Sequence, residues 1–467
     1  MTPWIRWDAA NAPAEPAWRW LAQSLGMPAL LATPARPQAE LTVPPSRIPQ
    51  SARQKLAALL EGGLRLDDAA RLSHAANAEA ADALRLRGGD LSRIPDAVFG
   101  PRSEDELLAL LKICGETGIA VGGPSNRHPA FAALELNGMA QIESLDAVSG
   151  LAQVQGGIGS AELKRQLAAR GMVFNAPEFD TLGCWIARGI GTGDVRDVRL
   201  ATPRGMLSGN LLPSRFGIVT AATLQVHAAP ASTVQLHYLF PDFASGLAAL
   251  RETRRESIAH TYMQLSDGDD TMFHRNLAAM SQAPSLMRRL MGMMRNPHLS
   301  PEKPAAFGIT ISGASADVDI ARKRFAALSK RLGASPAQIS AAQDYVPLLL
   351  DRGVTVDRIH TGATWSQLPV LYAALRSALD RAMRRHAPRA DAHGLVLTQI
   401  AGARHDGADL TCTFLYPRQL NAAVDQAQAI RRSAQDVLAA QGCNDAAPKG
   451  SVQNAIQALL DPAGILR

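Results

Sequence analysis

The chain has 467 residues, of which 47% are hydrophobic, so it is long enough to form more than one domain with a sizeable core. Its net charge of +6 is spread in short basic runs without interleaved aromatic residues, which argues against a nucleic-acid-binding protein. The four cysteines lie far apart and form no Cys-x-x-Cys pair, which argues against a disulfide framework or a zinc site and favours a reducing compartment.

Residues 1–98 are predicted to be helical, with proline-rich joints in the first half. Residues 51–86 have a strong helical pattern of apolar and polar positions. This segment is expected to act as a brace or lid, and His74 at its centre is interpreted as a surface or internally bonded histidine.

Residues 99–121 change to an α/β pattern, read as strand, helix, strand. Ser103 is expected to cap the helix, because Glu106 follows three residues later in the spacing of a capping box. Gly122, Gly123 and Pro124 follow the second strand.

Residues 131–228 are predicted to form short strands and one helix, with Ser160 as its N-cap. Four glycines come after this helix, namely Gly183, Gly189, Gly191 and Gly193. Glycine allows the main chain to come very close to a flat or anionic group. A strand is expected from Ile218 to Val226, and Pro230 then marks a domain boundary.

Residues 231 to about 435 repeat strand–helix–strand patterns, which predicts a ferredoxin-like sheet with helices on one face. The methionine-rich segment 278–295 is interpreted as a core-facing helix, or alternatively as the wall of an apolar ligand tunnel or a lipid-contacting surface. The tail, residues 436–467, ends in LLDPAGILR, read as a helix end, a turn and an apolar anchor.

Common cofactor motifs are absent from the sequence. Gly189-Ile190-Gly191-Thr192-Gly193 has two glycines of the dinucleotide fingerprint, but no helix is expected after it, so a nicotinamide site is not predicted. The eleven histidines form no tight pair at ligand spacing, so no metal site is expected. No secretory signal pattern and no run of about 18 apolar residues occurs, which predicts a cytoplasmic protein.

Several segments of the chain resemble the FAD-linked oxidases of the vanillyl-alcohol-oxidase/para-cresol-methylhydroxylase superfamily and occur in the same order as in that family. The resemblance covers nearly the whole chain and includes RIPDAVFGPRSEDELLALLKICGETGIAV, VQGGIGSAELKRQLAARGM, EFDTLGCWIARG and FGIVTAATLQVHAAP. The N-terminal WIRWDAANAP and the later LLLDRGVTVDRIHTGATWSQLPVLYAALRSAL are most similar to the alkyldihydroxyacetonephosphate (alkylglycerone-phosphate) synthase branch.

This resemblance implies an α+β fold with a PCMH-type FAD-binding domain of two α/β subdomains and a ferredoxin-like cap. The implied units are a helical brace (1–98), the FAD-binding domain (99–229), a cap or substrate domain (230–435) and a C-terminal segment (436–467). The implied FAD contacts are Gly122, Gly123, Ser125, Asn126, Thr181, Gly183, Trp185, Ile218 and Val219. The candidate catalytic residues are Tyr416, Arg418 and His360.

The chain departs from the family pattern at several of these places. The family's pyrophosphate loop has three glycines followed by Thr-Ser, whereas Val121-Gly122-Gly123-Pro124-Ser125-Asn126 stands here, and Pro124 removes a backbone N–H. Gln264 stands where the synthases have an active-site arginine, and Ala446-Ala447-Pro448 replaces their triple histidine.

Two functions therefore remain open. One is an FAD-dependent oxidoreductase or transferase that acts on a lipid-like or small hydroxy-acid substrate. The other is an FAD-free relative that serves as a binding or scaffold subunit. A homodimer, a partner flavoprotein and peripheral membrane contact are left open as interactions, and no nucleic acid is expected.

Overall fold

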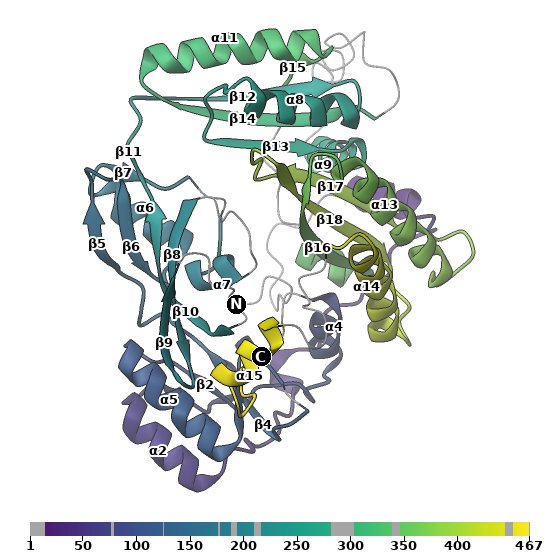
Figure 1. The fold of residues 1–467 in the computed structure, drawn as a ribbon. Helices are drawn as coiled ribbons and strands as arrows, with labels where there is room; N and C mark the ends of the chain where they lie inside the picture. Colours follow the sequence, from purple (N-terminus) through teal and green to yellow (C-terminus); the bar gives the residue numbers. More distant parts are fainter. Residues whose placement is uncertain are drawn as a thin grey trace.

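The computed structural model arranges the chain around three main β-sheets with helices packed on them (Figure 1). A four-stranded and a five-stranded sheet lie at the bottom and left of Figure 1, and a seven-stranded sheet occupies the top and right. This mixture of helices and sheets confirms the predicted α+β fold. The structure describes residues 15–75, 79–124, 126–175, 178–187, 194–209, 216–281, 303–338, 346–443 and 452–466.

The four-stranded sheet has the order β1-β2-β4-β3. Three of its strands are parallel, and β1 pairs antiparallel with β2 at one edge. Helices α2 (Gln50–Leu60) and α5 (Glu104–Thr117) pack against each other and share a buried core with the strands. The strands are β1 (Leu64–Arg65), β2 (Ala97–Phe99), β3 (Ile119–Val121) and β4 (Ala130–Leu134).

The predicted cap of α5 is confirmed. The hydroxyl of Ser103 accepts a hydrogen bond from the N–H of Glu106 at 3.1 Å, and the Glu106 carboxylate accepts from the N–H of Arg102 at 2.8 Å. The helix ends at Gly118, which has a left-handed φ of 67°. The turn brings the chain directly into β3, so the loop at 122–124 lies at the carboxyl end of the parallel strands.

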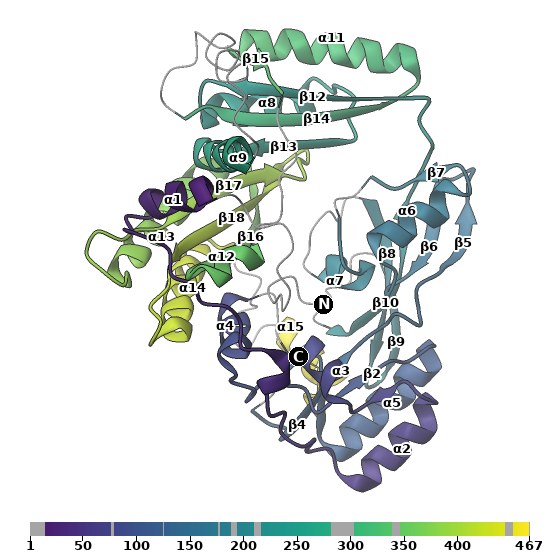
Figure 2. The ribbon, with the colours of Figure 1, turned by 180° about the vertical axis from the view of Figure 1, so that it is seen from behind.

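The helical pattern predicted for residues 51–86 is interrupted. Gly62 has φ 92°, and a Cβ atom on Gly63 would lie 2.3 Å from the carbonyl oxygen of Gly100, so the chain turns here and adds β1 to the sheet. The helices of this region are α1 (Glu15–Ser24), the 3-10 helix η1 (Gln38–Glu40), α2, α3 (Asp68–Ser73) and α4 (Ala80–Gly88). Helices α1 and α4 lie against the unit that contains the seven-stranded sheet (Figure 2).

The five-stranded sheet is antiparallel, with the order β5-β6-β10-β8-β9. Helix α6 (Ser160–Ala168) forms as predicted, but Ser160 is wrong as its N-cap. Gly159 occupies that position, and the Ser160 hydroxyl donates to Glu178 at 2.9 Å instead. The other elements are β5 (Ile142–Asp146), β6 (Leu151–Gln155), β7 (Met172–Val173), α7 (Leu182–Ala187), β8 (Val195–Thr202), β9 (Gly205–Gly209), β10 (Ile218–Gln225) and β11 (His227–Ala228).

The seven-stranded sheet begins after this unit and is antiparallel, with the order β15-β12-β14-β13-β17-β18-β16. Its strands are β12 (Ser232–Phe240), β13 (Tyr262–Ser266), β14 (Ala305–Gly313), β15 (Ser335–Pro336), β16 (Val354–Thr364), β17 (Leu395–Ala401) and β18 (Gly407–Pro417). One face is covered, as predicted, by α8 (Phe243–Arg255), α11 (Ser315–Arg331), α13 (Leu368–Arg385) and α14 (Ala423–Ala440).

Within the described residues, the other face of this sheet is covered only in part. Helix α1, α9 (Gly268–Ser281) and α12 (Val346–Asp351) form a second core there with Val354, Val356, Leu397 and Leu415. The methionine-rich segment 278–295 lies largely outside the described residues, so its predicted tunnel or lipid contact remains a prediction.

The C-terminal segment anchors itself on the four-stranded sheet. After α15 (Val452–Leu460), the carboxylate of Asp461 accepts from the N–H groups of Ile465 and Leu466 at 3.0 and 2.9 Å. Ile465 is fully buried, and its carbonyl accepts from the N–H of Val121 at 2.7 Å. The predicted helix end, turn and apolar anchor are confirmed.

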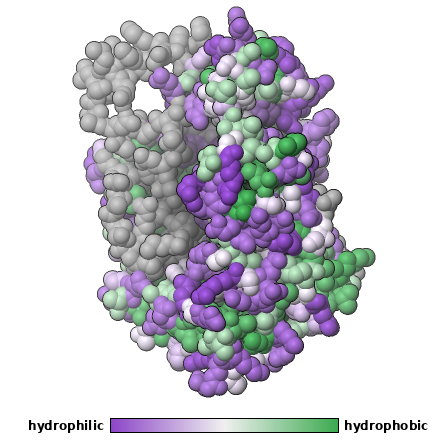
Figure 3. Space-filling model, turned by 90° about the vertical axis from the view of Figure 1, so that its left-hand side faces the viewer, coloured by the Kyte–Doolittle hydropathy of each residue, from purple (hydrophilic) through white to green (hydrophobic). Residues whose placement is uncertain are grey.

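The molecular surface of one side is shown in Figure 3. Outside the grey atoms, hydrophilic and hydrophobic residues alternate there in small patches. Within the described ranges, no helix combines the length and the apolar character needed to cross a membrane.

Candidate functional site

The loop at residues 122–124 offers few backbone donors. Gly122 has φ 98°, and its N–H already donates to the carbonyl of Ala132 at 2.9 Å. Pro124 has no N–H. Among the described residues, the N–H of Gly123 has no hydrogen-bond partner, so it is the one uncommitted backbone N–H of these three residues. Of the other predicted contacts here, Asn126 is exposed and Ser125 lies outside the described residues.

Side chains from the N-terminal helices approach this loop. A cavity of about 20 Å³, room for roughly one water molecule, is lined by His74, Ala75, Asp82, Arg93, Gly122, Gly123, Pro124, Phe131 and Ala133. Asp82 is buried and forms ion pairs with Arg85 at 2.5 Å and Arg93 at 3.0 Å. His74 bonds through Nδ1 to the carbonyl of Ala70, which accepts, and to the hydroxyl of Ser73, which agrees with its predicted structural role.

A second group of predicted FAD contacts comes together around α7. The Thr181 hydroxyl accepts from the N–H of Cys184 at 3.3 Å, and the N–H of Gly183 donates to the carbonyl of Gly156 at 2.7 Å. A Cβ atom on Gly183 would lie 3.1 Å from the Gly156 oxygen and 3.2 Å from the Val219 oxygen. Glycine at this position therefore lets α7 lie directly on β10.

Trp185 is the buried centre of this group. Its ring stacks on Phe179 with centroids 5.4 Å apart and meets Phe174 edge-on at 5.9 Å. The side chain is only 4% exposed, yet its indole N–H has no hydrogen-bond partner in the described part of the chain. An unpaired buried donor is costly unless a bound group accepts from it. The described residues thus fit a flavin nucleotide through the N–H groups of Trp185 and Gly123.

Ile218 and Val219 begin β10 beside this group. Val219 is buried in the same core as Trp185, and Ile218 pairs with Ala201 of β8. The structure therefore assembles Thr181, Gly183, Trp185 and Val219, whereas Gly122 and Gly123 belong to the other sheet of the same unit.

The cap sheet carries a row of polar side chains on the face opposite α13 and α14. In β16, Ile359 points into the helix-covered core, whereas Arg358 and His360 point to the other face, because alternate residues of a strand face opposite sides. Toward the beginning of the strand, α12 and α1 cover this face. Arg358 is exposed and His360 is half-buried. In both Figure 1 and Figure 2 the face that the described helices leave uncovered is turned toward the half that contains the four- and five-stranded sheets.

Two threonines of β18 support this polar row. His360 lies opposite Thr411, and its Nδ1 is 2.9 Å from the Thr411 hydroxyl. Arg358 lies opposite Thr413 and donates through Nε to its hydroxyl at 3.2 Å. The pairs fix two groups side by side, a cation that can hold an anionic group and an imidazole that can exchange a proton. Arg358 is not among the residues predicted from the sequence, although its position two residues before His360 in a strand places both side chains on the same face.

Tyr416 and Arg418 are not brought together with His360. Tyr416 is fully buried on the helix-covered face, and burial, with Asp357 nearby, raises its pKa well above 10. Arg418 is buried and donates to the carbonyl of Leu350 at 2.8 Å and to Thr33 at 3.4 Å. Burial lowers the pKa of Arg418 to about 10. Its contacts tie α12 and the N-terminal segment to β18. The catalytic roles of these three residues stay predictions.

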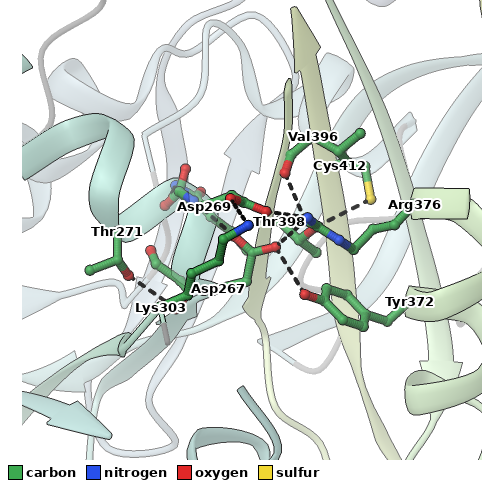
Figure 4. A network of polar contacts seen from close by, with 12 residues as sticks. Asp267, Asp269, Thr271, Lys303, Tyr372, Arg376, Val396, Thr398 and Cys412 are labelled. Atoms are coloured by element: carbon green, nitrogen blue, oxygen red, sulfur yellow. Dashed lines mark hydrogen bonds and ion pairs between the residues drawn. The ribbon is translucent and has the colours of Figure 1, made fainter. Parts of the chain in front are cut away.

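A second polar network, also missed from the sequence, joins α9 to α13 (Figure 4). Asp267 is fully buried, caps α9 by accepting from the N–H of Asp270 at 2.8 Å, and accepts from Arg376 at 2.6 Å and from the Tyr372 hydroxyl at 3.2 Å. Arg376 also binds Asp269, which Lys303 approaches to 2.9 Å. Burial raises the pKa of Asp267, and Arg376 counteracts that rise.

Metal binding finds no support in the ranges that the structure describes. No cluster of three or more histidine, cysteine or acidic side chains there could hold an ion. The cysteines Cys114, Cys184, Cys412 and Cys443 are all free.

Comparison with known families now gives a context to this geometry. Residues 95–205 match the family described as FAD binding domain, and residues 229–443 match the C-terminal domain of FAD linked oxidases. The two matches follow each other with a short gap. They contain, respectively, the 122–124 loop with Thr181, Gly183 and Trp185, and the polar row of the cap sheet, whereas Val219 lies between the two matches.

Curated relatives are alkyldihydroxyacetonephosphate synthases. The protein from Dictyostelium discoideum is 27% identical over 386 residues, which cover 70% of this chain and 63% of the relative. The one from Trypanosoma brucei brucei is 27% identical over 251 residues, 44% of this chain and 41% of the relative. The matches thus span less than two thirds of either relative.

Solved structures show the same fold. An alkyldihydroxyacetonephosphate synthase superposes with a TM-score of 0.76 at 20% identity, over 96% of this chain and 91% of that one. A p-cresol methylhydroxylase with substrate bound superposes with a TM-score of 0.66 at 14% identity, over 91% of this chain and 97% of the other. The identities are low, so the chain is divergent, and these similarities concern the fold alone.

Proposed function

Because the chain is a divergent relative of the FAD-linked oxidases, with their FAD binding domain and C-terminal domain in order, we propose that it is an FAD-dependent oxidoreductase or transferase similar to alkylglycerone-phosphate synthase. Its substrate would be lipid-like or a small hydroxy acid. The observation that carries the proposal is the polar row of Arg358 and His360 on the face of the cap sheet that the described helices leave uncovered. In Figure 1 this face of the sheet is turned toward the FAD binding domain.

The residues of this row have distinct roles in the proposal. Arg358, held by Thr413, would bind the carboxylate or phosphate of the substrate, since a guanidinium matches the planar geometry of such groups. His360, oriented through Nδ1 by Thr411, would hold or release a proton at its other nitrogen. Gln399 of β17 lies on the same face and adds a neutral polar group.

The cofactor half supplies the other part of the site. Trp185 and Gly123 would donate to a bound FAD, and the close approach of α7 to β10 at Gly183 would hold Trp185 in place. When bound, FAD supplies the redox chemistry that no protein side chain can provide. The protein contributes position, charge and exclusion of water.

A second candidate function is an FAD-free binding or scaffold subunit. It is favoured by the loop at 122–124, where Pro124 lacks an N–H, the Gly122 N–H is already bonded and the adjacent cavity holds about one water molecule. This candidate predicts that the purified protein is colourless.

The visible absorption spectrum of the purified protein, before and after addition of FAD, separates the two candidates. Flavin bands that remain with the protein through gel filtration support the enzyme. A colourless protein that does not retain added FAD rules out the enzyme and supports the binding subunit. Anaerobic reduction of the retained flavin by lactate then supports the hydroxy-acid class, whereas release of the fatty acid from an acyl dihydroxyacetone phosphate supports the lipid-like class.

A further inference from the structure

The loop at 122–124 has lost most of the donors that an anion needs. It lies at the carboxyl end of the parallel strands β2, β4 and β3, the edge at which α/β sheets bind ligands. A left-handed glycine followed by another glycine forms the kind of turn whose N–H groups can surround an anion. Here only the N–H of Gly123 is uncommitted among residues 122–124. These three residues thus offer a doubly charged pyrophosphate one backbone donor.

A cation stands beside this loop. Arg93 lines the same small cavity as Gly122, Gly123 and Pro124. Its side chain is 44% exposed, so the guanidinium can change partners without leaving a buried position. Arg93 follows α4 and is separated from the loop by the whole of β2, α5 and β3, so only the fold brings them together.

The present partner of Arg93 does not depend on it. Asp82, whose side chain is 7% exposed, lies 3.0 Å from Arg93, but Arg85 holds the same carboxylate oxygen at 2.5 Å. If Arg93 turned away, Asp82 would keep one charged partner and would not become an unpaired buried anion. Arg93 can therefore exchange Asp82 for another anion at a small cost in free energy.

The cavity beside Arg93 and the loop is small. At about 20 Å³ the space between Arg93 and the loop holds one water molecule and is too small for a phosphate group. Arg93 and Gly123 line the same cavity, so an outward movement of the Arg93 side chain would enlarge the space beside Gly123 and leave the guanidinium at its edge. Pairs of arginine and phosphate are frequently bidentate and charge-assisted.

We propose that Arg93 binds the pyrophosphate of FAD at the 122–124 loop and replaces the backbone donors that Gly122 and Pro124 cannot offer. This inference rests on the proposed function, since it requires that FAD binds. It assigns a cofactor-binding role to a residue of the N-terminal brace, outside the matched FAD binding domain at residues 95–205.

The test is a comparison of three ligands on the full chain. Dissociation constants of FAD, ADP and riboflavin are measured by isothermal titration calorimetry for the wild type, Arg93→Ala, Arg93→Lys and the control Arg165→Ala. Arg165 is an exposed arginine of α6 that pairs with Glu162 and does not line the cavity. FAD and ADP contain a pyrophosphate, whereas riboflavin does not.

For Arg93→Ala, the loss of a charge-assisted contact is expected to raise the dissociation constants of FAD and ADP by about tenfold to a hundredfold. The dissociation constant of riboflavin should stay within about twofold of the wild-type value. Arg93→Lys keeps the charge and should lose less, and Arg165→Ala should match the wild type. Unchanged FAD affinity in Arg93→Ala, or an equal loss for riboflavin, overturns the role of Arg93 while the proposed function stands. A wild type that binds neither FAD nor ADP overturns both.

Discussion

Arg376 of α13 donates to the buried carboxylate of Asp267, the residue that caps α9, over 2.6 Å. The pair joins a helix on one face of the cap sheet to a helix on the other face, and the Tyr372 hydroxyl donates to the same oxygen (Figure 4). Asp267 is fully buried, so its charge depends on these partners. The polar row at β16 is part of the same sheet.

Replacement of Arg376 by Met should therefore destabilise the cap strongly. The substitution leaves Asp267 buried without a cation, which typically costs about 3–5 kcal/mol. Urea denaturation followed by circular dichroism measures the change in the free energy of unfolding. The control is Arg384→Met on the same helix, where the pair with Asp380 is exposed and should cost less than about 0.5 kcal/mol. Equal effects of both substitutions would contradict the importance of the buried pair.

Gly123→Asp should abolish retention of FAD. The new carboxylate would stand beside the one free backbone donor of the loop and repel the pyrophosphate, so a loss of at least about a hundredfold in affinity is expected. The absorbance of flavin that co-elutes with the protein measures it. Gly115→Asp is the control, because Gly115 lies in α5 with open space around it. Normal flavin content in Gly123→Asp would show that FAD does not use this loop.

Trp185→Phe should weaken the binding of FAD, while the protein without FAD stays folded. The substitution removes the unpaired indole N–H and keeps an aromatic ring between Phe174 and Phe179. Loss of one hydrogen bond to the cofactor predicts about fivefold to tenfold weaker binding. The rise in melting temperature on addition of FAD should fall accordingly.

Trp18→Phe is a matched control for that experiment. The indole N–H of Trp18 is also buried without a partner, but it lies in α1 against the cap. Its substitution should leave the FAD-induced shift unchanged. If the two variants lose the same shift, the unpaired donor at Trp185 has no special relation to the cofactor.

Arg358→Ala should raise the KM for an anionic substrate about tenfold or more and leave the flavin content unchanged. The side chain contacts Thr413 of the cap sheet and none of the predicted flavin contacts. His360→Gln should instead lower kcat, because glutamine keeps a polar group without the proton exchange. Steady-state rates with lactate and with acyl dihydroxyacetone phosphate test both, with Arg255→Ala on the exposed surface of α8 as the control.

The stability of the protein should fall below about pH 6.5, partly through His260. Burial lowers the pKa of His260 from its ordinary value of 6.5, although its bond to the Ile258 carbonyl at 2.8 Å opposes the effect. The folded state then binds fewer protons than the unfolded state, so the stability present above pH 6.5 is lost as the pH falls from 6.5 toward the folded pKa.

His260→Gln should flatten this dependence. One proton corresponds to at most about 1.4 kcal/mol per pH unit, so the slope of unfolding free energy between pH 6.5 and 5.5 should decrease by less than that. Urea denaturation at several pH values provides the slopes. Identical slopes in the variant and the wild type would show that other groups account for the acid sensitivity.

Much of the fold could be predicted because local patterns agree with it. The capping box at Ser103 and the strand pattern from Ile218 depend on neighbouring residues in the sequence, and both are present in the structure. Ser160 failed as a cap because the preceding glycine takes the cap position and the serine bonds to Glu178, a long-range contact. The helical pattern predicted for residues 51–86 is interrupted at Gly62-Gly63, because Gly100 lies too close to Gly63 for a Cβ atom there.

The site was predicted less completely because its residues meet through tertiary contacts. Family likeness indicated Thr181, Gly183 and Trp185, which the structure brings together. It did not indicate Arg93, which reaches the loop only through the packing of α4, or Arg358, whose exposure depends on where α12 ends. Alternation along β16 could have linked Arg358 to His360, and alternation along β18 separates Tyr416 from Thr411.

The bond between Val121 and Ile465 has a consequence for biosynthesis. Strand β3 leaves the ribosome long before the residues that complete its edge, so the loop that follows β3 acquires its final support only after translation has passed Ile465. Until then the edge of the four-stranded sheet is open to other chains. A nascent chain could carry a nearly finished cap and still lack a competent cofactor loop. Uptake of flavin would then report the completion of synthesis, and a tag or truncation at the C-terminal segment would impair it.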